Sequence, residues 1–377
     1  MNPFLISTVI LSVLIIVIGG FVLDKYGWDY LIEQLLEPER KDMLLYTDPV
    51  LPDYLSFDKP SLSFNGVSTP EEFVNWKKDI REKMIDLMDI PDNLLIGNLQ
   101  VVDKNGNLTK YTMDAFDGDI IIFYELLPET ETNHAVIIFP GSGNQGAKDV
   151  LGLDSEISKF YYHREIGKEV ASQNYAVYVI EQRGWGERQI DAGGLCIEKA
   201  LLGSSSLSCS GYAFARILSS YGMTLGRLQI IDALTLTDYV RSLGYEKITV
   251  MGLSLGGGTA MISAALRDDV TNAVLASSIS SVEKSFTFDA DGMLQYYDVP
   301  DIVSMIAPRP IYLSWGLNEN LPYRFEAETL YSAFKIQEAY EVFNATEKMI
   351  IIVHDDTFNS GHNYQTDSVL KFLKENS

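Results

Sequence analysis

The chain has 377 residues, enough for one large α/β domain with additions, and its 29 basic and 52 acidic side chains give a formal net charge of −23. Such a charge repels the phosphates of nucleic acids and the headgroups of anionic lipids. We therefore expect no nucleic-acid partner.

Residues 4–23 form the first distinctive segment, because none of these 20 residues is charged. A helix of that length, at about 1.5 Å per residue, spans a hydrocarbon core of about 30 Å, so we predict a transmembrane anchor over residues 1–23. A cleaved signal peptide is the alternative, but no basic side chain precedes the segment and no small-x-small site precedes Asp24. The basic residues that follow favour a cytoplasmic domain. The cysteine pair described below favours the extracytoplasmic side, which we adopt as the prediction.

Residues 24–98 are predicted to be a tether followed by a helical extension. The sequence TPEE at residues 69–72 is typical of a helix start, with an N-cap, a proline at the first helical position and acids in the first turn. The helix should run to about Met88. One stripe of it is apolar and is predicted to be a packing face: Phe73, Trp76, Ile80, Met84 and Leu87.

From residue 99 the pattern changes to strands. Turn residues at 104–107 and 117–118 predict antiparallel hairpins over residues 99–102, 111–116 and 120–127. Short apolar runs separated by helical stretches then follow at residues 135–139, 176–180, 248–251, 273–276, 310–315 and 349–353. Strands that alternate with helices form a parallel sheet covered on both faces. We therefore assign residues 99–377 to one α/β domain with a mostly parallel sheet and antiparallel N-terminal strands.

The loop at residues 140–146 reads PGSGNQG and follows the first of the parallel strands. Its G-x-G-x-x-G spacing is typical of dinucleotide-binding loops, and Glu181 ends the next strand, where a ribose-binding acid would lie. However, Glu181 lies 35 residues beyond the last glycine, instead of about 20, and the loop follows hairpins. We prefer a loop whose backbone N–H groups, that of Ser142 or that of Gly143, complete an oxyanion hole with the N–H of Leu255.

Residues 193–223 form a Gly-, Ser- and Tyr-containing insertion that holds both cysteines, Cys196 and Cys209. From its position we predict a lid or rim that selects substrate. The cysteines could close a small loop in an exported protein or remain thiols in the cytosol, and the sequence leaves both open. Their spacing does not suggest a metal site, and we predict neither a metal nor a diffusible cofactor.

The most informative stretch is KITVMGLSLGGGTAM, residues 247–261. A strand pattern leads into GLSLG at residues 252–256 and then into a helical pattern, which gives a G-x-S-x-G motif between a strand and a helix. A sharp turn there exposes the Ser254 hydroxyl at the carboxyl edge of the sheet, and the glycines let the two backbones pass closely. We predict that Ser254 is a nucleophile and that the N–H of Leu255 faces the same point.

A serine nucleophile needs a general base and an acid that orients the base, in the chain order serine, acid, histidine. Two of the four histidines follow Ser254. His354 continues the last strand, where a structural histidine is more common, whereas His362 lies in a polar loop and is the predicted base. Glu319 follows the strand at residues 310–315, 65 residues after Ser254 and 43 before His362, and is the predicted acid.

Together these features resemble the α/β-hydrolase superfamily, and within it the dienelactone hydrolase-like and acetyl xylan esterase-like branch, over residues 120–377. Besides the serine motif, the likeness depends on EQRGWGER at residues 181–188, which is similar to the D-x-R-G-x-G-E-R loop of that branch, and on residues 222–234 and 301–310. The chain differs from the branch where Pro140 replaces a common histidine and where Glu319 replaces the usual aspartate.

The resemblance implies that the protein hydrolyses small-molecule or carbohydrate carboxylic esters, deacetylation of sugars among them, through Ser254, His362 and Glu319. It does not identify the ester. A serine peptidase of the prolyl-oligopeptidase type is an alternative, although the N-terminal part is too short for a propeller. A non-catalytic or dinucleotide-binding protein on the same scaffold is another, and the intact order of serine, acid and histidine argues against it.

Overall fold

The computed structural model describes residues 60–143, 145–153, 162–190, 210–280, 292–317, 319 and 325–377. All the elements below belong to one unit, formed by residues 58–192 and 210–377. Several predicted features lie outside the described residues and stay predictions: the anchor, the tether up to residue 59, both cysteines and residues 193–209 of the lid. None of the helices in the described ranges combines the length and apolar character needed to cross a bilayer.

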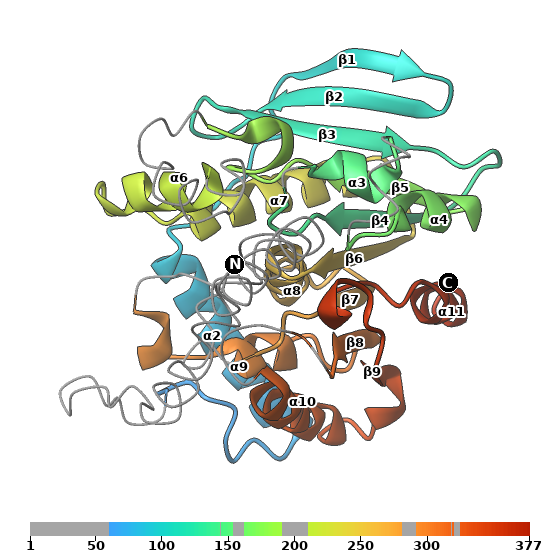
Figure 1. The fold of residues 1–377 in the computed structure, drawn as a ribbon. Coiled ribbons are helices and arrows are strands. Elements are labelled where there is room, and N and C mark those ends of the chain that lie inside the picture. Colours follow the sequence, from blue (N-terminus) through green and yellow to red (C-terminus); the bar gives the residue numbers. More distant parts are fainter. Residues whose placement is uncertain are drawn as a thin grey trace, which may run out of the picture. The chain divides into compact units, whose positions relative to one another are not determined.

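The described residues form one nine-stranded sheet with the order β1-β2-β3-β5-β4-β6-β7-β8-β9 (Figure 1). The strands are β1 (Leu99–Asn105), β2 (Leu108–Asp114), β3 (Ile120–Leu126), β4 (His134–Phe139), β5 (Ala176–Ile180), β6 (Lys247–Leu253), β7 (Asn272–Ala276), β8 (Ile311–Gly316) and β9 (Met349–His354). Strands β1 to β3 pair antiparallel, as does β3 with β5, and every other pair is parallel. The predicted mostly parallel sheet with antiparallel N-terminal strands is therefore confirmed.

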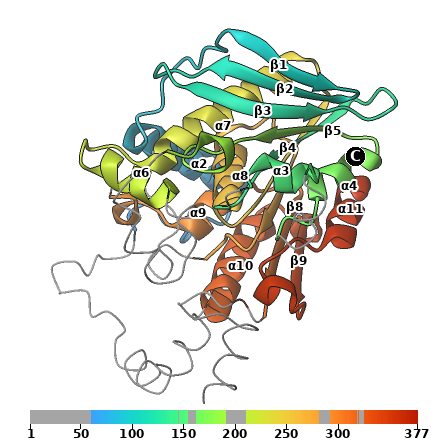
Figure 2. The ribbon, with the colours of Figure 1, turned by 45° about the horizontal axis from the view of Figure 1, so that its top comes forward.

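Helices cover both faces of this sheet, as Figures 1 and 2 show. One hydrophobic core joins the sheet to α2 (Pro70–Leu87), α7 (Leu225–Ser242), α8 (Leu255–Leu266), α9 (Val299–Ser304) and α10 (Phe325–Glu341). A second core lies on the opposite face, with α3 (Ala147–Leu151), α4 (Ile166–Ser172) and α11 (Thr366–Glu375). Successive strand residues alternate between the cores, since Ile137 belongs to the first, and Val136 and Ile138 to the second. The helix α6 (Ser210–Ser219) packs on α7.

The predicted N-terminal helix is α2, and its start has the expected chemistry. The Thr69 side chain accepts a hydrogen bond from the backbone N–H of Glu72, while the Glu72 carboxylate accepts from the backbone N–H of Thr69. The predicted stripe faces the core, with Leu87 only partly buried and four residues buried: Phe73, Trp76, Ile80 and Met84. This part of residues 24–98 therefore packs on the α/β unit.

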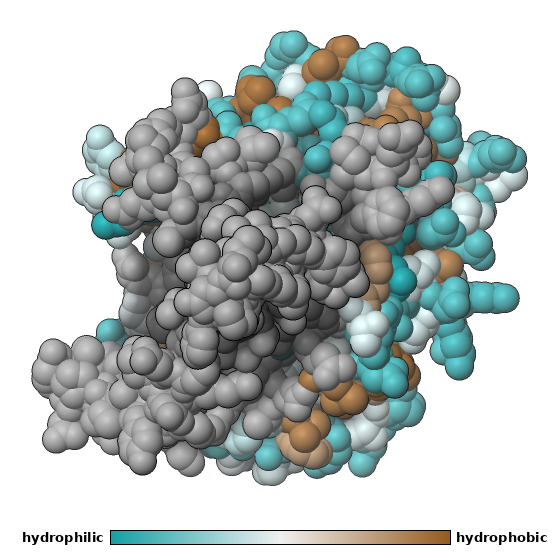
Figure 3. All heavy atoms as spheres, viewed as in Figure 1, coloured by the Kyte–Doolittle hydropathy of each residue, from teal (hydrophilic) through white to brown (hydrophobic). Residues whose placement is uncertain are grey.

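The sheet ends at β1, an edge strand. The surface near β1 and β2 in Figure 3 is mainly hydrophilic, with isolated hydrophobic patches. Val101 and Val102 are exposed on β1 and are followed by the charged residues Asp103 and Lys104. Charged side chains on an edge strand oppose its pairing with another chain.

Candidate active site

Ser254 lies in the turn between β6 and α8. Its backbone has φ 56° and ψ −121°, a conformation that residues other than glycine rarely adopt, and its N–H donates to the carbonyl oxygen of Ala276 over 2.9 Å. The flanking glycines are required, because side chains there would clash with the backbone. A Cβ atom on Gly256 would lie 1.8 Å from the carbonyl oxygen of Phe139. A Cβ atom on Gly252 would lie 2.0 Å from the carbonyl oxygen of Gly256. The turn therefore leaves Ser254 partly exposed at the carboxyl edge of the sheet.

Glu319 and His362 meet at the same edge, beyond β8 and β9. The Glu319 side chain is 1% exposed, and its Oε1 accepts hydrogen bonds from the N–H of Gly316, over 3.0 Å, and from the hydroxyl of Ser277. Its Oε2 lies 3.3 Å from Nδ1 of His362. The segments that follow β8 and β9 approach each other closely at two glycines. A Cβ atom on Gly316 would lie only 2.7 Å from Cα of Gly361. One carboxylate oxygen is thus held by the protein and the other faces the histidine.

The remaining histidines differ from His362 in their surroundings. Nε2 of His134 lies 2.8 Å from the Thr249 hydroxyl, and burial lowers the pKa of His134 to about 4. Burial also lowers the pKa of His354, whose two ring nitrogens have no hydrogen-bond partner in the described part of the chain. Of the two histidines after Ser254, only His362 lies within hydrogen-bonding distance of a described carboxylate. The structure thus brings His362 and Glu319 together, and their roles as base and acid stay predictions.

The loop after β4 approaches the serine turn, since a Cβ atom on Gly141 would lie 3.1 Å from the carbonyl oxygen of Leu253. The N–H of Gly141 donates to Nε2 of His163 over 2.9 Å, and the N–H of Gly143 donates to the carbonyl oxygen of Gly141 over 2.8 Å. For the N–H of Ser142, the described residues offer no such acceptor. The structure therefore favours Ser142 over Gly143 as the oxyanion-binding residue.

Four residues that the motifs did not identify surround this site: Asp149, Tyr162, His163 and Ser277. The ring of Tyr162 lies 5.7 Å from that of His362, centroid to centroid. Ser277 directly follows β7, and a polar residue at the carboxyl end of the strand between those of Ser254 and Glu319 is a signal that could have located it. No comparable local signal marks the other three, whose contacts depend on the completed fold.

Buried ion pairs hold the loop after β5, which includes η3 (Gly186–Arg188). Arg183 donates from Nε and Nη2 to the Asp232 carboxylate on α7, over 2.6 and 2.9 Å, and from Nη1 to Asp117, over 2.5 Å. Arg188 donates to Asp232 as well, over 2.7 Å. Arg183 and Asp232 come from two of the segments on which the resemblance depends. Their pairing gives both segments a structural role.

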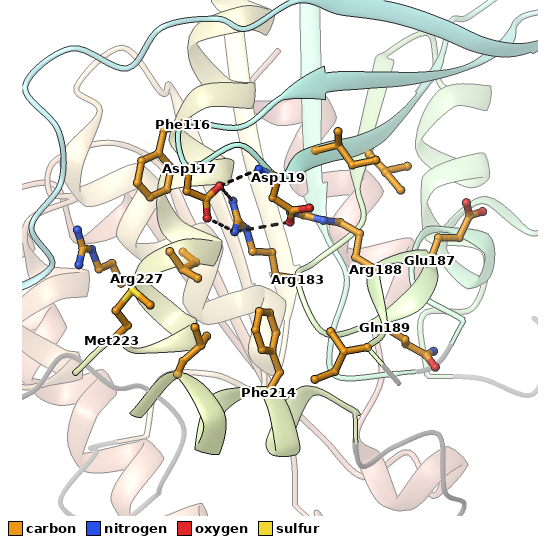
Figure 4. A pocket seen from close by; sticks show the side chains of 15 residues that line it. Phe116, Asp117, Asp119, Arg183, Glu187, Arg188, Gln189, Phe214, Met223 and Arg227 are labelled. Carbon is orange, nitrogen blue, oxygen red and sulfur yellow. Dashed lines mark hydrogen bonds and ion pairs between the residues drawn. The ribbon is translucent and has the colours of Figure 1, made fainter. Parts of the chain in front are cut away.

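The same arginines line a pocket of about 650 Å³. Figure 4 shows Phe214 of α6 directed toward Arg183, with Asp117 and Asp119 beyond it. These four charged groups are paired with one another, and the wall combines apolar side chains with three further polar or charged ones: Glu187, Gln189 and Arg227. None of Ser254, Glu319 and His362 lines this pocket, so we keep it separate from the candidate active site.

Glu181 directly follows β5 and is completely buried. Its Oε1 accepts a hydrogen bond from the N–H of Ala147 over 3.2 Å, and a Cβ atom on Gly146 would lie 2.0 Å from its Oε2. The carboxyl therefore fills the space at the start of α3 that a phosphate would need in a dinucleotide-binding protein, which counts against that alternative. Burial raises the pKa of Glu181 to about 8, so this carboxyl is protonated at neutral pH.

We expect Glu181 to make the protein less stable as the pH rises. Its pKa is 4.5 without perturbation and about 8 in the folded protein, so folding takes up a proton between these values. The free energy of unfolding should therefore fall by about 1.4 kcal/mol per pH unit in this window and level off above it. Glu181→Gln, which keeps the acceptor for Ala147, should remove this contribution. Denaturant unfolding of both proteins across the window measures it, and identical pH dependences would contradict the assignment.

Comparisons with known proteins agree with the architecture. The model of the Abhydrolase family matches residues 34–288, more than half of the chain. The segment includes Ser254 and ends before Glu319 and His362, so the family match does not extend to those two residues. No curated protein sequence matches the chain.

Solved structures with a similar fold include three proteins named as esterases. A Bacteroides fragilis protein provisionally described as an acetyl xylan esterase has 17% identity and a TM-score of 0.64, covering 84% of this chain and 91% of its own. Glucuronoyl esterases from Teredinibacter turnerae and Solibacter usitatus have 14% and 12% identity and TM-scores of 0.55 and 0.57. They cover 84% and 85% of this chain, and 89% and 97% of their own. With these similarities and the family match together, the chain belongs to the Abhydrolase family and has the α/β-hydrolase fold.

Proposed function

We propose that this protein is a serine hydrolase that cleaves carboxylic esters. The observation that carries the proposal is the position of Ser254 on a strained strand-to-helix turn, at the sheet edge where Glu319 and His362 also lie. A strained turn of this kind persists where the surrounding structure fixes it, and it presents the hydroxyl to a substrate. The similarity in fold to proteins named acetyl xylan esterase and glucuronoyl esterase supports ester hydrolysis and suggests carbohydrate esters as the substrate class.

In this mechanism Ser254 Oγ attacks the ester carbonyl carbon while Nε2 of His362 takes the hydroxyl proton. Glu319 accepts the Nδ1 proton of His362 in a hydrogen bond and stabilises the imidazolium. The N–H groups of Leu255 and Ser142 bind the oxygen that becomes negative. When the tetrahedral intermediate collapses, the alcohol leaves with the proton from His362 and the acyl group stays on Ser254. Water, deprotonated by His362, then attacks the acyl carbon. The bond between that carbon and Oγ breaks, His362 returns the proton to Ser254, and the acid is released.

The test uses the purified full-length protein and two carbohydrate esters. In the first the sugar is the alcohol part of the ester, and in the second it is the acid part. An acetylated xylo-oligosaccharide releases acetate when its acyl group is cleaved, and the methyl ester of glucuronic acid releases methanol. Release of acetate or of methanol identifies whether the sugar is the alcohol or the acid part of the substrate. Hydrolysis of p-nitrophenyl acetate detects esterase activity without a sugar. A folded protein that cleaves none of the three and is not labelled by a fluorophosphonate would overturn the proposal.

We also propose that residues 4–23 anchor this hydrolase in a membrane with the α/β unit on the extracytoplasmic side. The uncharged run and the two cysteines support this arrangement. Fractionation of cells that express the chain, followed by protease treatment of intact cells, tests both points. Recovery in the soluble fraction would contradict the anchor, and protection from the protease would contradict the orientation.

A further inference from the structure

A second buried histidine–carboxylate pair lies beside the loop after β4. His163, in the turn before α4, and Asp149 of α3 are each 1% exposed. Nδ1 of His163 lies 2.6 Å from Oδ2 of Asp149, and Nε2 of His163 accepts the hydrogen bond from the N–H of Gly141. Neither residue is needed for the transfer of a proton from Ser254 to His362. The pair therefore needs an explanation of its own.

These two hydrogen bonds fix the tautomer of His163. A backbone N–H can only donate, so Nε2 has to be the unprotonated nitrogen that accepts from Gly141. Nδ1 then carries the proton and donates it to Asp149. If the ring proton lay on Nε2 instead, that N–H and the N–H of Gly141 would face each other and the loop would lose its anchor.

We propose that His163 and Asp149 position the oxyanion hole, an inference that rests on the proposed ester hydrolysis. The N–H of Gly141 is held by His163, and the carbonyl oxygen of the same residue receives the N–H of Gly143. This closed turn leaves the N–H of Ser142 as the donor beside the serine turn. Because the turn is attached to the rest of the protein through Nε2 of His163, losing that acceptor moves the Ser142 donor away from the oxygen it must stabilise.

The segment that carries His163 is itself fixed on both sides. Arg164 and Glu165 adopt φ values of 52° and 56°, a left-handed conformation that persists in such residues where neighbouring contacts determine it. Arg164 donates from Nη1 to Asp356, over 3.0 Å, in the segment that precedes His362. On the other side, the ring centroids of Tyr162 and His163 lie 4.3 Å apart. The hydroxyl oxygen of Tyr162 lies so near the loop that a Cβ atom on Gly143 would be 2.6 Å from it. Few movements of His163 are compatible with these contacts.

The test compares the hydrolysis of an ester with that of its thiono analogue, in which sulfur replaces the carbonyl oxygen. An oxyanion hole stabilises developing charge on oxygen better than on the larger sulfur, so the ratio of the two rates reports the hole and not the amount of active enzyme. His163→Phe removes the acceptor and keeps a ring. It should lower kcat for the ester roughly 10- to 100-fold, and KM should change less than about threefold. The rate for the ester divided by the rate for the thiono ester should fall about 10-fold.

Three further variants complete the design. His163→Gln offers an amide oxygen near the position of Nε2 and should recover part of the ratio. Asp149→Leu should lower it, because that variant removes the acceptor that keeps the imidazole proton on Nδ1 and nearly keeps the size of the side chain. His134→Phe is the matched control, since it also removes a buried histidine with a hydrogen bond, here to Thr249 of β6, and should leave the ratio unchanged.

The outcomes separate this inference from the proposed function. A wild-type protein that cleaves no ester contradicts the proposed function itself. A wild-type protein that cleaves the ester, with the same rate ratio in folded His163→Phe, overturns the role of His163 and leaves the esterase proposal intact. If His163→Phe does not fold, Asp149→Leu decides the matter, because an unchanged ratio in that variant contradicts the positioning role of the pair.

Discussion

Replacing Ser254 with alanine is expected to lower kcat for ester hydrolysis by about 10⁴- to 10⁶-fold and to leave stability almost unchanged. Catalysis should be lost because the hydroxyl oxygen is the atom that forms the acyl–enzyme bond. Stability should be kept because Ser254 is only partly buried and its side chain does not cap α8. Steady-state kinetics on the ester that the wild type cleaves and denaturant unfolding measure these two effects, and fluorophosphonate labelling reports whether the nucleophile is lost.

A neighbouring serine provides the control for this experiment. Ser278 follows β7 and is buried against the start of α8, where a Cβ atom on Gly257 would lie 2.3 Å from its hydroxyl oxygen. Ser278→Ala should be labelled like the wild type, and His362→Ala should be labelled as poorly as Ser254→Ala. Full labelling of Ser254→Ala would show that another residue is the nucleophile, and the assignment of Ser254 would then be wrong.

The serine turn could be predicted from sequence because its determinants are local. A strand, two glycines around a serine and a helix occupy consecutive residues, and the close approaches at Gly252 and Gly256 explain why no other residue type fits there. The strands were equally accessible, since short apolar runs alternate with helices along the chain. Their observed limits differ from the predicted ones by a few residues, as in β2, which begins at Leu108 and not at 111.

The surroundings of the site could not be predicted in the same way. Asp149 and His163 are separated by 14 residues, and Arg183 and Asp232 by 49, and each pair meets only when the sheet has formed. A lone aspartate or histidine in a sequence carries no sign of its partner, so residue type gave no basis for these pairs. The order serine, acid, histidine was enough to select Glu319 and His362, but the choice between Ser142 and Gly143 required the hydrogen bonds of the loop.

Replacing Glu319 with glutamine is expected to lower kcat by about 10³- to 10⁴-fold, although the amide has nearly the shape of the carboxylate. The hydrogen bonds determine which way the amide points. Gly316 N–H and the Ser277 hydroxyl both donate to Oε1, so that position requires the carbonyl oxygen of the glutamine. The NH₂ group is then directed at Nδ1 of His362, where Oε2 lies in the wild type.

An amide that donates to Nδ1 forces the proton of neutral His362 onto Nε2, the nitrogen that has to accept the proton of Ser254. The variant should therefore fold normally and fail in catalysis, as shown by a kcat that falls while KM and the unfolding midpoint stay close to wild-type values. Ser277→Ala is the matched control. It removes one donor to Oε1 but keeps the charge facing His362, so its kcat should fall far less than that of Glu319→Gln. Equal losses in the two variants would mean that the Glu319 side chain acts only through packing, and His362 would need a different orienting group.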